Sequence, residues 1–119
     1  MNNCLQSSDF AELGISAVKE FQRRVHDLSD DLCAPFHDEA RCLETEILSF
    51  YKVAALHAKR ADDLDQVASV WQTMARICDD AAKEIEALHK KHPECGAGSY
   101  RDKLIDLRNK CLRLQQMHQ

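Results

Sequence analysis

The sequence contains few of the two residues that most often interrupt helices. Its 119 residues include three glycines and two prolines. An all-β chain needs many tight turns, and glycine and proline form most of them. This scarcity argues against an all-β fold and indicates long, uninterrupted helical stretches. The length of the chain suits one domain with a single hydrophobic core.

The sequence also lacks an excess of positive charge, an export signal and a long apolar run. Sixteen Lys and Arg residues stand against twenty Asp and Glu residues, for a net charge of −4. General electrostatic attraction to nucleic-acid phosphates is therefore not expected. Residues 1–6 have no basic segment followed by an apolar one, and no apolar run reaches membrane-spanning length. We expect a cytoplasmic protein that binds neither nucleic acid nor membrane and keeps its six cysteines reduced.

Apolar residues recur three and four residues apart in four stretches, which places them on one face of a helix in each stretch. The first stretch begins at Asp9, a predicted N-cap, and the fourth begins at Ser99, another predicted N-cap. Residues 1–8 are expected to form a flexible tail, and residues 9–119 a single helical domain. We call such a line of apolar residues along one helix face a stripe. The most regular stripe consists of Leu64, Val67, Trp71, Met74, Cys78, Ala81, Ile85 and Leu88.

The segment from residue 36 to residue 92 contains no glycine or proline, so two architectures are open. One is a continuous central helix over about residues 36–91 in a three-helix protein. The other has a tight turn near Ala61, because Lys59 and Arg60 suit a helix C-terminus and Asp62 suits the N-cap of a new helix. We favour the turn, which predicts an all-α, antiparallel up-down-up-down four-helix bundle.

The four predicted helices differ in charge. They carry −3, zero, −3 and +3 in chain order. In an up-down-up-down bundle the fourth helix would lie between the first and the third, and its positive charge suits that place. Exposed ion pairs contribute less than about 1 kcal/mol each, so charge alone does not establish the arrangement.

Cysteine and histidine, the side chains that zinc prefers, gather near two of the connections. Such a bundle brings the first and third connections to the same end, so four of these residues could meet in a tetrahedral zinc site. The spacing matches no established zinc motif, and capping or packing explains such residues equally well. The candidate metal ligands are Cys33, His37, His89, His92 and Cys95.

Other chemistry has weaker support in the sequence. Glu86 and His89 have the spacing of a di-iron motif, but the chain has no second copy of it. Cys78 and Cys111 fall on apolar stripes and are expected in the core, whereas Cys42 flanks its stripe. We therefore expect no enzyme.

Some predicted helices have apolar faces wider than one packing seam needs. The extra residues are Phe50 and Tyr51 in the second helix, and Ile105 and Leu112 in the fourth. Either these wider faces are fully used inside the monomer, or they leave exposed apolar surface that dimerises or binds a partner helix. The sequence thus favours a protein-interaction or self-association module, with a protein partner or a homo-oligomer. A zinc-binding bundle, with zinc as cofactor, is the alternative.

Overall fold

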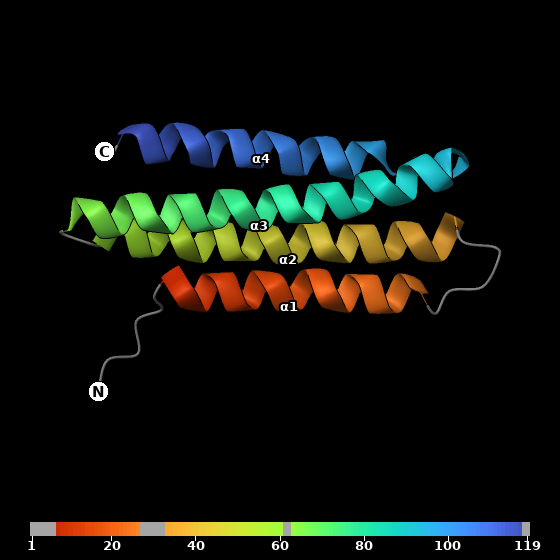
Figure 1. Cartoon of the computed structure of the whole chain (residues 1–119), viewed down its shortest axis with the longest axis horizontal. Coiled ribbons are helices and arrows are strands. Elements are labelled where there is room, and N and C mark those ends of the chain that lie inside the picture. The colour runs from red at the N-terminus through yellow and green to blue at the C-terminus, as the bar shows by residue number, and fades with distance from the viewer. Residues whose placement is uncertain (1–6, 27–32, 61–62, 118–119) are drawn as a thin grey trace.

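The computed structural model describes residues 7–26, 33–60 and 63–117. These residues form an all-α bundle in which successive helices run in alternating directions (Figure 1), and they include no strand. The predicted up-down-up-down fold is thereby confirmed. None of the described helices is long and apolar enough to cross a membrane. The elements are α1 (Ser7–His26), α2 (Cys33–Arg60), α3 (Leu64–Lys91), the short 3-10 helix η1 (Pro93–Cys95) and α4 (Gly98–Met117).

Two helices occupy the segment that lacks glycine and proline. α2 ends at Arg60, and Asp63 has an extended backbone (φ −95°, ψ 110°) just before α3 begins. α3 then runs back alongside α2 (Figure 1). The alternative of one continuous helix over residues 36–91 is wrong, because the extended residue ends the helical hydrogen-bond pattern.

A carboxylate cap explains where α3 starts. Asp63 Oδ1 accepts hydrogen bonds from the backbone N–H of Asp65 (3.0 Å) and of Gln66 (3.4 Å). These bonds satisfy two backbone donors that have no partner inside the helix, which typically stabilises a helix by about 1 kcal/mol. The sequence predicted Asp62 as the cap, and Asp62 lies outside the described residues.

Two predicted helix starts are displaced. α1 begins at Ser7, so Asp9 lies in its first turn, where an acidic side chain interacts favourably with the helix dipole. α4 begins at Gly98, so Ser99 lies within the helix and is not its cap. The carbonyl of Ala97 accepts hydrogen bonds from the N–H groups of Tyr100 and Arg101 in that first turn. A flexible tail was predicted over residues 1–8. Residues 1–6 lie outside the part of the chain that the structure describes, and residues 7 and 8 belong to α1.

All four helices contribute to one hydrophobic core. The apolar stripe of α3 is buried from Val67 to Ile85, as its period predicted. Because α3 packs against every other helix, its stripe lies at the centre of the bundle. Fully buried large side chains from the four helices include Phe10, Ile47, Met74, Ile85 and Leu104.

The lateral order of the helices differs from the prediction. Within the described residues α1 and α4 do not pack against each other, and α3 lies between them (Figure 1). The bundle is flattened as a result, with dimensions of 50 × 31 × 15 Å. The prediction that α4 lies between α1 and α3 is therefore wrong.

Ion pairs hold α4 against α3. Arg108 Nη1 lies 2.7 Å from Asp79 Oδ1, and Arg101 pairs with Glu86. Hydrogen bonds from these arginines lower the pKa of Asp79 and that of Glu86. The basic fourth helix thus pairs with the acidic third, although it does not also reach the first.

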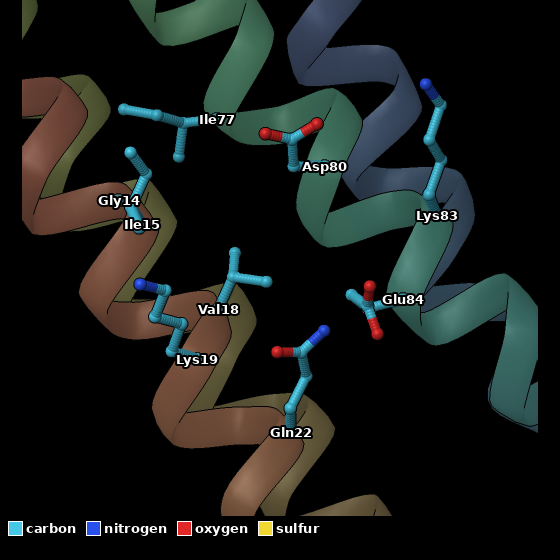
Figure 2. Close-up of a pocket in the computed structure, with 9 residues that line it drawn as sticks. All are labelled: Gly14, Ile15, Val18, Lys19, Gln22, Ile77, Asp80, Lys83 and Glu84. Carbon is cyan, nitrogen blue, oxygen red and sulfur yellow. The ribbon is translucent and has the colours of Figure 1, made fainter.

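A glycine lets α1 approach α3 closely. A Cβ atom at Gly14 would lie 2.4 to 2.7 Å from three side-chain carbons of Ile77. Ile77 points from α3 toward Gly14 on α1 (Figure 2), and its side chain is buried. α1 is thus in direct contact with α3, whereas the charge pattern had placed α4 between these two helices.

Candidate functional site

The predicted metal ligands lie at one end of the bundle. The end of α3, η1 and the starts of α2 and α4 meet there (Figure 1), and α2 packs against η1. The topology that a shared site requires is therefore present. Cys33 begins α2, but its side chain is outside the description.

Two of the predicted ligands, His37 on α2 and Cys95 in η1, pack against neighbouring parts of the chain. The ring of His37 lies against the ring of Tyr100, with 5.7 Å between centroids at 62°. Its Nε2 atom is 3.9 Å from where a Cβ would stand on Gly96, so His37 does reach the third connection. Cys95, in η1, is buried with 2% of its surface exposed.

The other two histidines lie at the end of α3. His89 is half-buried, and its Nδ1 atom has no hydrogen-bond partner among the described residues. His92 caps α3, and its Nδ1 atom lies 3.4 Å from a carboxylate oxygen of Glu94.

The zinc site stays a prediction. In the described part of the chain, no three or more His, Cys, Asp or Glu side chains are grouped so that they could hold a metal ion. A set that includes Cys33 is untested by this geometry. Zinc analysis of protein purified without added metal, compared with a Cys33→Ser, Cys95→Ser variant, addresses it.

The groove between α1 and α3 is shallow and carries both signs of charge. It measures about 260 Å³ and opens beside Gly14 and Ile77 (Figure 2). Lysines and acidic residues both line it, so no one charge dominates. Small-molecule sites usually enclose about 300 to 1,000 Å³, and this groove is smaller and open. Its lining residues also include Ile15, Val18, Lys19, Gln22, Asp80, Lys83 and Glu84.

The outward half of α2 carries three apolar side chains that stay partly exposed, and one of them, Leu48, lines a groove beside α4. Leu48 is 38% exposed, Val53 43% and Leu56 49%. They lie within nine residues of a helix whose opposite side is in the core. The residues between and before them on this surface are small or polar. We call this surface the outer face of α2: Cys42, Thr45, Glu46, Leu48, Ser49, Lys52, Val53 and Leu56, all exposed.

The residues that the sequence singled out as surplus apolar surface behave differently. Phe50 and Tyr51 are half-buried against the core, and the Tyr51 ring lies 5.5 Å from that of Trp71. Ile105 also packs against the core, whereas Leu112 is 41% exposed. A signal for the outer face was present, because Leu48 and Leu56 are spaced by two helical turns outside the core stripe.

No family model matches the chain, and neither the curated proteins nor the solved structures include a significant match to it. Its function must therefore be inferred from its own geometry.

Proposed function

We propose that this chain is a non-enzymatic protein-interaction module that binds through the outer face of α2. The observation that carries the proposal is the exposure of Leu48, Val53 and Leu56 on one helical surface. Burying apolar surface contributes about 25 cal/mol per Å², so covering this face favours association. A neighbouring helix can be received there without any special chemistry.

The arrangement of the face supports this role. Leucine and valine alternate with Thr45 and Ser49, whose small side chains allow another backbone to approach closely. The charged residues Glu46 and Lys52 lie on the same exposed surface, where they can pair with charges on a partner. In the described part of α4, two large apolar residues are exposed, Leu112 and Met117, against three on α2.

Crosslinking in intact cells tests the proposal. A photoreactive amino acid at position 49 is expected to give a discrete covalent product. Replacing Leu48 and Leu56 with Ser is expected to reduce this product about tenfold or more, because exposed leucines lose roughly 1 kcal/mol each when their burial is lost.

The matched control removes apolar surface elsewhere. Ser at both Leu112 and Met117 leaves the outer face of α2 intact, so the product should persist. Equal yields from the two double variants, or no product from position 49, would refute the proposed interaction surface.

A further inference from the structure

We propose that the partner is a second copy of this chain, whose α2 packs antiparallel on α2 of the first about a two-fold axis near Ser49. This inference rests on the proposed interaction surface and specifies what occupies it. It is carried by the spacing and the charge order of exposed residues along α2.

The spacing defines a second packing seam on α2, opposite its core stripe. Exposed residues recur at intervals of three and four along the whole helix, so they line one lengthwise strip of its surface. Ser49 lies at the middle of this seam, and small residues there permit close approach of two helices. The seam consists of Asp38, Cys42, Thr45, Ser49, Lys52, Leu56 and Lys59.

Charge along α2 is divided into two halves. Among its exposed side chains, residues 33–48 contribute two acidic ones and one basic one, whereas residues 49–60 contribute three basic ones and none that is acidic. Two parallel copies would place acidic against acidic and basic against basic. An antiparallel pair places each acidic half beside a basic half, which is complementary and closes as a two-fold dimer.

A two-fold axis near Ser49 brings matching residues to the same level. Glu46 then lies level with the second copy's Lys52, and each such pairing occurs twice. In the described part of the chain, neither side chain forms an ion pair, and none of the residues three or four positions from either one along α2 is charged. Both charges are thus available to a partner.

The same axis aligns other residues. Cys42 lies level with Leu56 of the second copy, and Thr45 with Val53 of the second copy. Cys42 lies far from its own counterpart, because fourteen residues of helix correspond to roughly 21 Å along the axis. Antiparallel packing therefore predicts no disulfide between the two Cys42 residues.

Charge exchange tests the direction of packing in the full chain. Glu46→Lys and Lys52→Glu are each expected to weaken self-association about tenfold, measured by sedimentation equilibrium, because two attractive pairings become repulsive. The combined Glu46→Lys, Lys52→Glu variant is expected to self-associate as the native chain does. Circular dichroism controls for loss of helix in each variant.

Mixing gives the sharper result. The exchanged variant and the native chain should each pair with themselves and not with each other, because a mixed antiparallel pair faces like charges. Preferential mixed pairs, single variants that associate as tightly as the native chain, or a Cys42 to Cys42 disulfide under oxidised glutathione would overturn the antiparallel dimer.

The outcomes separate this inference from the proposed function. A monomeric native chain that still crosslinks from position 49 to a different protein would refute the dimer and leave the interaction surface standing. A monomeric chain that gives no crosslink would refute both.

Discussion

In the folded chain, at concentrations low enough to keep it monomeric, iodoacetamide is expected to modify Cys42 at least about a thousandfold faster than Cys78 or Cys111. Cys42 is exposed, whereas Cys78 and Cys111 have no exposed surface. Reagent reaches the buried thiols only when α3 and α4 separate or the chain unfolds. Domain stabilities of about 5 to 15 kcal/mol keep such states below about one molecule in a thousand.

The chemistry of the buried thiols adds to this protection. The hydrogen bond with the Cys111 side chain raises the pKa of Cys78, and burial raises it further. Only the thiolate attacks an alkylating reagent, so the neutral Cys78 is poorly reactive even when reagent arrives.

Peptide mass spectrometry after timed labelling gives the rate at each cysteine. In denaturant the three residues should react at similar rates, which controls for reagent and sequence. Comparable rates for Cys42 and Cys111 in the folded chain would show that α4 does not cover α3 as the structure places it.

Replacing Gly14 with Val is expected to destabilise the chain by about 2 to 3 kcal/mol. The new side chain would overlap Cγ1, Cγ2 and Cδ1 of Ile77. Because Cγ1 and Cγ2 both branch from the Cβ of Ile77, a rotation that moves one away brings the other closer. Overpacking typically costs about 1 to 3 kcal/mol, and the better helix propensity of Val over Gly returns only a few tenths. Urea unfolding followed by circular dichroism measures the change.

A second substitution identifies the contact responsible. Ile77→Ala alone should cost about 2 to 5 kcal/mol by leaving a cavity. Combined with Gly14→Val, it should cost less than the sum of the two changes, because Val fills that space. Ser16→Val, at an exposed position of α1, should change stability by less than about 0.5 kcal/mol. Additive costs in the double variant would place Gly14 and Ile77 apart.

The class of fold was predictable because the apolar residues of each helix repeat at regular intervals along the sequence. The stripe of α3 from Val67 to Ile85 repeats every three or four residues, and each of its members is buried. The local order of charge likewise located the break after Arg60, since basic residues end α2 and a carboxylate caps α3. Both signals act within a few residues, so no knowledge of packing was needed.

The lateral order of the helices was not predictable by the same means. Net charge placed α4 beside α1, but exposed ion pairs contribute too little to determine packing. The close approach at Gly14 depends on Ile77, which lies 63 positions later in the chain. A single glycine in a helix does not by itself indicate such a contact. Steric fit between distant residues therefore decided the arrangement.

The sequence predicted what kind of site to expect, but not which residues form it. An apolar surface for association was expected, but on Phe50 and Tyr51, which the core half-buries. Leu48 and Val53 fall outside the core stripe, and only the position of the other helices shows that they stay 38% and 43% exposed.

Hydroxyl-radical footprinting over a range of protein concentrations tests most directly whether the outer face of α2 is an interface between two copies of this chain. Oxidation of Leu48, Val53 and Leu56 should fall several-fold as concentration rises, while Met117, 75% exposed on α4, should be oxidised equally throughout. Undiminished oxidation of all three residues at every concentration would contradict self-association through this face.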